Sequence, residues 1–206
     1  MVSPLTTLTA TLLLIGAGPA WAASSQDLTV KGVITPSACA PVVSGGGTVD
    51  FGKVSVKDLN ADTYTDLPRE TMLLSVRCEG PTIFTLNTID NRAGTAASHF
   101  SWHGLGMTPS DEKVGDAGLG LYSPVADGVP VRTITSRDGG VTWIPSVMLS
   151  HTLLTAVADS DGLAPIAIQE LDAEIRLITH IAPASNLTLT DEVPIDGHAT
   201  VQVNYL

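Results

Sequence analysis

Short runs of alternating apolar and polar residues cover most of this 206-residue chain. A period of two is the signature of a β-strand with one buried face. The clearest run is ATVQVNY, residues 199–205, which places Ala199, Val201, Val203 and Tyr205 on one face. The Asp-Gly pair shortly before it is a turn signal. The pattern predicts a half-buried strand at the end of the sequence.

The run IQELDAEIRLITHI, residues 168–181, fits two periods. Some of its apolar residues recur at helical spacing, but an alternating pattern accounts for more positions. We therefore predict a strand here, with charged residues on its outer face. The residues expected on its inner face are Leu171, Ala173, Ile175, Leu177 and Ile181.

Further runs rich in Val, Ile, Leu and Thr are bounded by Gly, Pro or Asp, the residues typical of turns. A turn is expected at Glu79-Gly80-Pro81, between two of these runs. Strands at such regular spacing indicate an all-β protein, either a sandwich or a barrel. The expected strands are residues 28–34, 48–56, 71–78, 82–89, 118–125, 129–135, 141–149 and 151–157.

The first residues are typical of a secretory signal. An apolar run, residues 12–17, precedes Ala20-Trp21-Ala22, which fits the small-residue pattern of a signal-peptidase site. The run is too short to span a membrane, which takes about 20 apolar residues. We predict a signal peptide at residues 1–22 and a single exported domain at residues 23–206.

The chain has a formal net charge of −11. Nucleic acids and anionic membranes attract clustered Lys and Arg, so this acidity argues against both as partners. Cys39 and Cys78 are the two cysteines. In an exported chain such a pair favours a disulfide over a metal pair or a catalytic thiol.

The octapeptide SRDGGVTW, residues 136–143, matches the Asp-box of sialidases. Asp138, Gly139 and Gly140 suit a tight hairpin turn, and Trp143 suits the start of a returning strand. Sialidase propellers carry several such boxes, whereas this chain has one. We therefore predict a hairpin and neither an enzyme nor a cofactor.

A second motif, HFSWH, has its histidines His99 and His103 at a spacing that could bind metal on a helix. The surrounding Gly and Ser residues instead predict a solvated loop. No metal is expected at this position.

Three segments resemble subunits of chaperone–usher pili: VKGVITPSACAPV, GGGTVDFGKV and LLSVRCEG. Gly32, Cys39, Phe51-Gly52 and Cys78 follow the order and spacing of those subunits. Residues 81–96 and 187–206 also resemble blocks of a family of uncharacterised exported β-proteins encoded beside fimbrial genes. Together the resemblances imply a pilin-like, immunoglobulin-like β-sandwich with one disulfide. They also imply a location in the periplasm or on a cell-surface fimbria of a Gram-negative bacterium.

The resemblance further implies a sandwich that lacks its final strand. A periplasmic chaperone, and later a neighbouring subunit, would add a strand beside the last one. Val201, Val203 and Tyr205 would border the groove, and the carboxylate of Leu206 would be held by the chaperone. The alternative is a self-complete periplasmic carbohydrate-binding or accessory protein, in which residues 199–205 are an ordinary closing strand.

Residues 23–27 are too short and polar to be donated to another subunit, unless residues 28–34 are themselves the donor. We therefore expect a strand acceptor, placed at the tip or end of a fibre. The region 90–150 is longer than a simple pilin needs, and loops at the end of a sandwich commonly bind ligands. Trp102 and Trp143 are the candidates for stacking against a surface glycan.

Overall fold

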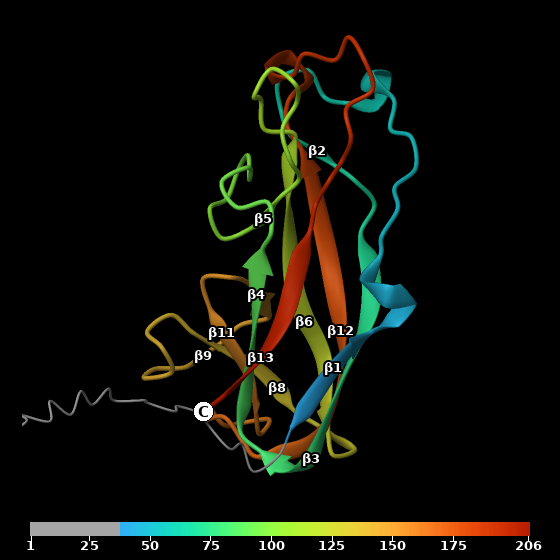
Figure 1. Cartoon of the computed structure of the whole chain (residues 1–206). Helices are drawn as coiled ribbons and strands as arrows, with labels where there is room; N and C mark the ends of the chain where they lie inside the picture. Colours follow the sequence, from blue (N-terminus) through green and yellow to red (C-terminus); the bar gives the residue numbers. More distant parts are fainter. Residues whose placement is uncertain (1–37) are drawn as a thin grey trace, which may run out of the picture. The chain divides into compact units, whose positions relative to one another are not determined.

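The computed structural model describes residues 38–206, and within this range β-strands make up nearly all regular structure (Figure 1). The predicted signal peptide and the predicted strand at residues 28–34 lie outside the described residues. In the described part, no helix is long and apolar enough to cross a membrane. The strands are β1 (Cys39–Val43), β2 (Thr65–Asp66), β3 (Glu70–Thr82), β4 (Phe84–Asp90), β5 (His103–Gly104), β6 (Gly115–Ala126), β7 (Val129–Pro130), β8 (Arg132–Ser136), β9 (Ile144–Pro145), β10 (Met148–Leu149), β11 (Leu154–Ala158), β12 (Ile168–Ile181) and β13 (Ala199–Tyr205).

The strands form two antiparallel sheets that pack face to face. The larger sheet has the order β1-β3-β12-β6-β10, with β2 beside β12 and with β5 and β7 beside β6. The smaller sheet has the order β13-β4-β11-β8-β9. In Figure 1 the long strands β3, β12 and β6 form one layer, and β13 and β4 lie in the other. This arrangement confirms the predicted β-sandwich.

β12 is the central strand of the larger sheet and confirms the choice of period two over a helix. It pairs with β3 along one side and with β6 along the other. Leu171, Ala173 and Ile175 are buried, whereas Asp172 and Arg176, which alternate with them, are exposed. The alternating pattern identified the strand correctly because successive side chains of a strand point in turn to the core and to the outer face of the sheet.

The disulfide between Cys39 and Cys78 is present and joins β1 to β3. The two cysteines are also direct partners in the β1–β3 ladder, which continues to Val43 opposite Leu74. β1 is only five residues long and lies at the edge of its sheet. The covalent bond therefore anchors a short edge strand that its backbone pairing holds on one side only.

The prediction of a strand at residues 48–56 is wrong. Asp50 Oδ1 accepts a hydrogen bond from the N–H of Gly52 at 2.8 Å, and Gly52 has a φ of 62°. This local turn interrupts an extended backbone, because a side chain that bonds the main chain two residues on competes with sheet pairing. Phe51 and Val54 nevertheless pack against a buried apolar cluster, and because they are three residues apart their burial does not follow the alternating pattern.

The expected turn at residues 79–81 is also wrong, because β3 runs on to Thr82 and the break falls at Ile83. There the chain leaves the larger sheet, and β4 begins in the smaller one. The Gly80-Pro81 pair lies within β3, at a point where the register of the β3–β12 ladder shifts. Arg77 faces Glu170 before the shift, and Thr82 faces Ile168 after it. Residues 141–149 differ as well, since they contain only the two-residue strands β9 and β10, one in each sheet.

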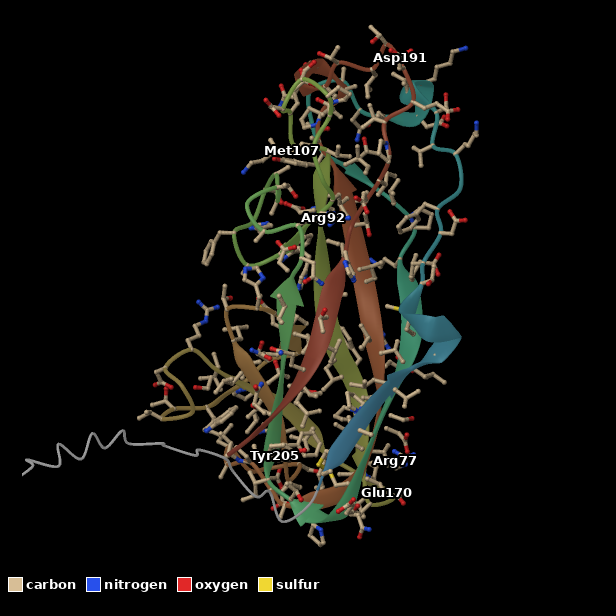
Figure 2. All side chains as sticks on the ribbon, viewed as in Figure 1. Arg77, Arg92, Met107, Glu170, Asp191 and Tyr205 are labelled. Carbon is tan, nitrogen blue, oxygen red and sulfur yellow. A yellow bond between two sulfur atoms is a disulfide. The ribbon has the colours of Figure 1, made fainter. Side chains whose placement is uncertain are left out.

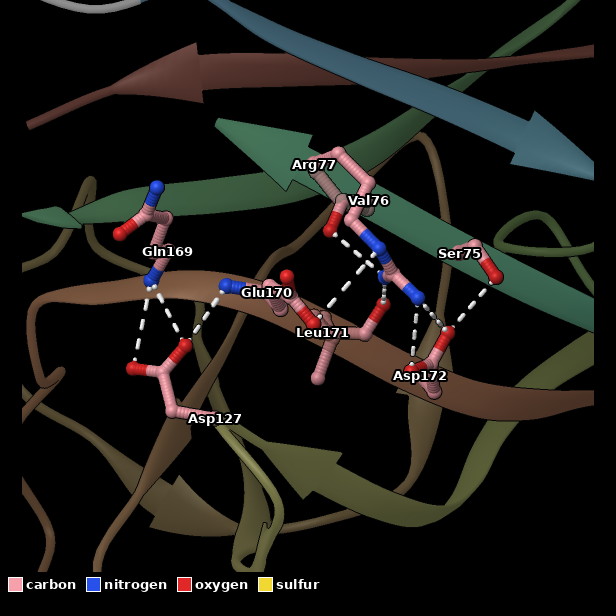
Figure 3. A network of polar contacts seen from close by, with 8 residues as sticks. All are labelled: Ser75, Val76, Arg77, Asp127, Gln169, Glu170, Leu171 and Asp172. Carbon is pink, nitrogen blue, oxygen red and sulfur yellow. Dashed lines mark hydrogen bonds and ion pairs between the residues drawn. The ribbon is translucent and has the colours of Figure 1, made fainter. Parts of the chain in front are cut away.

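A polar network secures this irregular end of β12 (Figure 3). Asp127, with a φ of 48°, accepts hydrogen bonds from the backbone N–H groups of Gln169 and Glu170. Arg77 binds both carboxylate oxygens of Asp172, at 2.8 and 2.9 Å. Asp172 also accepts a bond from Ser75, and the bonds from Ser75 and then Arg77 hold its pKa below the usual value. All these groups lie at or near the surface, so we assign them a structural role.

Candidate functional site

The candidate site begins at β13, which lies at the edge of the smaller sheet and, among the described residues 38–206, pairs with β4 alone. Just outside the strand, His198 O accepts a hydrogen bond from Asn91 N–H, and Leu206 N–H donates one to Ile83 O. Antiparallel partners alternate between hydrogen-bonded and non-hydrogen-bonded pairs. The even-numbered residues of β13 therefore bond to β4. The residues that direct their N–H and C=O groups away from β4 are Ala199, Val201, Val203 and Tyr205.

The side chains of the same alternate residues face the interior. Val201 and Val203 are half-buried and pack against the principal hydrophobic core. Tyr205 is 41% exposed and Leu206 is 60% exposed, beyond the end of the strand. The three residues predicted to border an acceptor groove, Val201, Val203 and Tyr205, thus lie along one edge of the sheet, and Leu206 follows them.

β1 is the edge strand of the opposite sheet and lies nearest to β13. At the lower end of Figure 2, the hydroxyl oxygen of Tyr205 accepts a hydrogen bond from the backbone N–H of Cys39 at 2.9 Å. No backbone pairing joins the two strands within residues 38–206. The sandwich therefore has a seam between β1 and β13 that side chains close at one end.

A groove with a volume of about 1560 Å³ runs along this seam. Its mouth is crossed at one point by an ion pair between Lys53 Nζ and Glu192 Oε1, at 2.6 Å, and both side chains are almost fully exposed. An exposed pair of this kind contributes little to stability. The groove is lined by Pro41 and Val43 of β1, Ala199 and Val201 of β13, Ile175, Leu177, Thr179 and Ile181 of β12, and parts of residues 46–54 and 187–198.

A polar layer crosses the interior at the level of Val201. Val201 faces Thr88 in the β4 ladder, and the hydroxyl of Thr88 lies 2.7 Å from His103 Nε2. His103 in turn faces Ala117 on β6, and Ala117 faces Thr179 on β12. Thr88, His103 and Thr179 are each at most 3% exposed. The layer separates the principal core from a second apolar cluster, which includes Leu105, Val114 and Ile181.

The sequence prediction of a solvated loop is wrong for His103, although His99 is exposed. His103 Nδ1 lies 3.2 Å from the carbonyl oxygen of Ala117, so Nδ1 donates there and Nε2 accepts from Thr88. Burial lowers the pKa of His103 below its usual value of 6.5. The ring is therefore a neutral part of the interior. In the described part of the chain, no three His, Cys, Asp or Glu side chains gather as metal ligands.

The two tryptophans predicted to bind a glycan are not brought together. Trp102 lies against Gly118 of β6 in the larger sheet, with its ring 4.7 Å from that of His180. Trp143 packs against the buried cluster around Ile134 of the smaller sheet, and its Nε1 donates to Gly140 O at 3.0 Å. Each ring thus has a packing role in a different sheet, and glycan binding stays a prediction.

The Asp-box-like motif forms the predicted hairpin loop between β8 and β9. Asp138 accepts hydrogen bonds from the Thr142 hydroxyl, the Thr142 N–H and the Ser136 hydroxyl, which lower its pKa to about 2. Gly139 and Gly140 have φ values of 75° and 95°, where a side chain would be strained. All of these bonds stay within the loop and its ends, to the backbone N–H of Thr142 and to the hydroxyls of Ser136 and Thr142.

Comparisons with known proteins match the sequence to a family of unknown function and to two proteins of Escherichia coli. Residues 28–103 match the family described as "Protein of unknown function (DUF1120)". The chain is 28% identical over 239 residues to Protein GltF of Escherichia coli (strain K12), across 94% of both chains. It is 22% identical over 224 residues to Uncharacterized protein YhcF of the same strain, across 91% of this chain and 93% of the relative. The similarity to these two proteins extends over nearly the whole chain, while a fimbrial context stays a prediction.

Sequence reasoning missed the polar layer, although one signal was available. The inner face of residues 168–181 reads Leu171, Ala173, Ile175, Leu177 and Ile181, and the position between the last two is Thr179. A threonine in an otherwise apolar face marks a polar site in the core. Its position level with the distant His103 and Thr88 could not be read from the sequence, because it depends on sheet register.

Proposed function

We propose that this protein is a fimbria-associated subunit, structural or adhesive, of the chaperone–usher type. In this proposal the groove between β13 and β1 accepts a β-strand, first from a periplasmic chaperone and then from a neighbouring subunit. One observation carries the proposal. Among the residues that the structure describes, the outer edge of β13 has no strand partner and borders a groove that reaches the hydrophobic core, so one extended segment could complete both the sheet and the core.

The energetics of the edge support strand addition. An open strand presents unpaired backbone groups and is an aggregation hazard unless it is covered. Here Val201 and Val203 also remain half-buried where a full sandwich would enclose them. An added strand would bond to the backbone of these residues and insert alternate side chains into the groove. Such a mode needs no charge complementarity, which suits a chain with a net charge of −11.

The disulfide supports the proposed location. A bond between Cys39 and Cys78 persists in an oxidising compartment such as the periplasm or the cell surface. The proposed place in a fibre is the tip or end, as an acceptor that donates no strand. Immunogold labelling of purified fibres tests this place: label at fibre ends supports it, and label at regular intervals along the fibre contradicts it.

The decisive experiment expresses the protein in the periplasm, alone and together with a fimbrial chaperone, followed by size-exclusion chromatography. We expect aggregation or degradation of the protein alone and a one-to-one complex in the presence of the chaperone. The double variant Val201→Thr and Val203→Thr keeps the side-chain shape but adds hydroxyls, so the complex should be lost. The matched control is Val129→Thr with Val141→Thr, two exposed valines outside the groove, which should leave the complex intact.

The opposite result would favour the second candidate, a self-complete periplasmic accessory or carbohydrate-binding protein. A soluble monomer that melts sharply without a chaperone would indicate that the sandwich needs no further strand. The same monomer could then be screened on a glycan array with Trp102→Ala and Trp143→Ala as comparisons.

A further inference from the structure

The loop between β4 and β5, residues 91–102, contains no helix or strand but is fastened to the sandwich by side chains from outside it. Asp116 of β6 is fully buried, and its Oδ2 accepts hydrogen bonds from both the backbone N–H and the hydroxyl of Ser98. The Tyr64 hydroxyl donates to Ala97 O at 3.0 Å. Loops of this length without regular structure are uncommon in compact domains, and those that are held in one conformation commonly bind ligands.

Residues of this loop, together with Asp90, Lys113 and His151, line a pocket of about 360 Å³. This volume lies at the lower end of the range for small-molecule sites, and it accommodates one sugar ring. Two aromatic side chains belong to the lining. Trp102 is half-buried, whereas Phe100 is 85% exposed, the highest value among the exposed large apolar side chains of the described residues. The ring of Phe100 is therefore open to contact with a ligand.

The polar groups of the pocket that remain free to bind a ligand are donors. Ala93 and Gly94 are exposed, and their backbone N–H groups make no hydrogen bond within residues 38–206. Gly94 has a φ of 87°, and successive N–H groups in a turn of this kind form a concave site for an anion. Lys113 is exposed as well, and its Nζ donates to Ala96 O at 3.1 Å. An ammonium group has three donors, so Lys113 keeps donors for a ligand.

The carboxylate that lines the pocket is engaged by the fold. Asp90 is 8% exposed, its Oδ1 accepts a hydrogen bond from the N–H of Arg92, and its Oδ2 accepts one from the N–H of Gly104. The net charge of −11 acts over longer distances, and salt at physiological ionic strength screens it beyond about 8 Å. The pocket thus favours a ligand that combines a carboxylate with an apolar ring face.

We infer that this pocket binds an acidic carbohydrate through one hexuronic acid unit. The carboxylate of the sugar accepts charge-assisted hydrogen bonds from Lys113 and from the N–H groups of Ala93 and Gly94, and the apolar face of its ring packs on Phe100. The inference gives a ligand to the adhesive role of the proposed function. It does not require strand acceptance, because the pocket and the groove share no lining residue.

Calorimetric titration with galacturonic acid and with galactose tests this inference, because the two sugars share a ring and differ in the carboxylate. The protein is the full exported chain, free or in its chaperone complex. We expect galacturonic acid to bind at least about tenfold more tightly than galactose, and more tightly than acetate by a similar factor. Lys113→Met should abolish the preference for the acid, whereas Lys113→Arg, which keeps the charge, should retain it. Phe100→Ala should weaken the binding of galacturonic acid about fivefold, because the ring contact is lost.

The matched control is Lys57→Met, which removes an exposed lysine that does not line the pocket and should leave binding unchanged. Equal binding of the two sugars, or a preference for the acid that survives Lys113→Met, overturns the inference. Acetate that binds as tightly as galacturonic acid overturns it too, because the ring would then contribute nothing. If none of the three compounds binds, this inference fails alone, since strand acceptance is decided separately by formation of the chaperone complex.

Discussion

The backbone N–H of Cys39 donates a hydrogen bond of 2.9 Å to the hydroxyl oxygen of Tyr205. Cys39 is also disulfide-bonded to Cys78, so one position links β1, β3 and β13. The contact joins the edge strands of the two sheets at one end of the seam, and neither residue lines the groove. It joins the start of the first described strand to the end of the last one.

Loss of this hydrogen bond should weaken the closed end of the seam. Tyr205→Phe removes only the hydroxyl, and we expect it to lower the free energy of unfolding by about 1 kcal/mol, the net contribution of a typical hydrogen bond. Urea unfolding followed by circular dichroism measures the change. Tyr122→Phe is the matched control, since the Tyr122 ring, with Arg176 above it, is retained. An equal loss in both variants would contradict a specific role for Tyr205.

Removal of the disulfide should have a larger effect. Replacing Cys39 and Cys78 together by alanine removes a crosslink across a sequence separation of 39 residues. In the chain-entropy model, a loop of this size contributes about 4 kcal/mol to the free energy of unfolding. Urea unfolding should shift by this amount, and wild type in the presence of a reductant should shift similarly. A double variant as stable as oxidised wild type would refute the anchoring role of the bond.

His103 should make the fold sensitive to mild acid. Its pKa is lowered in the folded state, so the unfolded chain takes up the proton first as the pH falls below the usual value of 6.5. Stability is therefore lost as the pH decreases through this range, and the loss ends at the folded-state pKa. Because one proton is involved, the slope is at most about 1.4 kcal/mol per pH unit.

Urea unfolding at several values between pH 7.5 and pH 5 measures this slope. His103→Gln should flatten it, because glutamine does not titrate, whereas the exposed His198→Gln should leave it unchanged. The carboxylates with lowered pKa values, such as Asp172, titrate below this window and do not interfere. An identical slope in all three proteins would show that His103 does not govern it.

Asp138 should order the β8–β9 loop. Its carboxylate accepts the N–H groups of Val141 and Thr142, so Asp138→Ala should speed hydrogen exchange at these two amides. The pKa of about 2 implies that the wild-type loop keeps its protection as the pH falls, until it approaches that value. Asp161→Ala, in another exposed loop, should leave both amides unaffected. Unchanged hydrogen exchange in Asp138→Ala would show that Gly139 and Gly140 fix the conformation of the loop without the carboxylate.

Gly118 should be required for the position of Trp102. A Cβ atom at Gly118 would lie 2.6 Å from the indole ring, so Gly118→Ala must displace it. We expect a shift in tryptophan emission, read in a Trp143→Phe background, and a loss of about 1–3 kcal/mol in unfolding free energy. Gly80→Ala, where a Cβ would meet nothing within 4 Å, is the control. Emission identical to the parent would contradict the packing of Trp102 on β6.

Much of the sandwich could be predicted from alternation, because strands with one buried face are recorded directly in the sequence. β12 and β13 were predicted with nearly their observed bounds. The errors fall where tertiary structure overrides a local signal. Asp50 and Gly52 form a turn in a segment whose alternation predicted a strand. The Gly-Pro pair at residues 80–81, which predicted a turn, lies within β3.

The candidate site could be predicted only in part. The residues of one edge, Val201 to Tyr205, follow from the pattern and from the pilin resemblance. The wall of the groove opposite β13 could not be predicted, because it comes from β1 and from residues 46–54, whose position depends on how the sheets face each other. The buried state of His103 escaped prediction because its neighbours in sequence are Gly and Ser, while its contacts are Thr88 and Ala117.

The pairing of β13 with β4 also has a consequence for the timing of folding. Thr85 and Asn204 are partners although 119 positions separate them in the chain. Contacts of such long range form late and slowly. A chain interrupted before residue 199 could assemble most of the larger sheet but would leave β4 as the edge, with Leu86 uncovered. The proposed acceptor edge therefore exists only after residues 199–205 have paired with β4, so a chain without them could not accept a strand there.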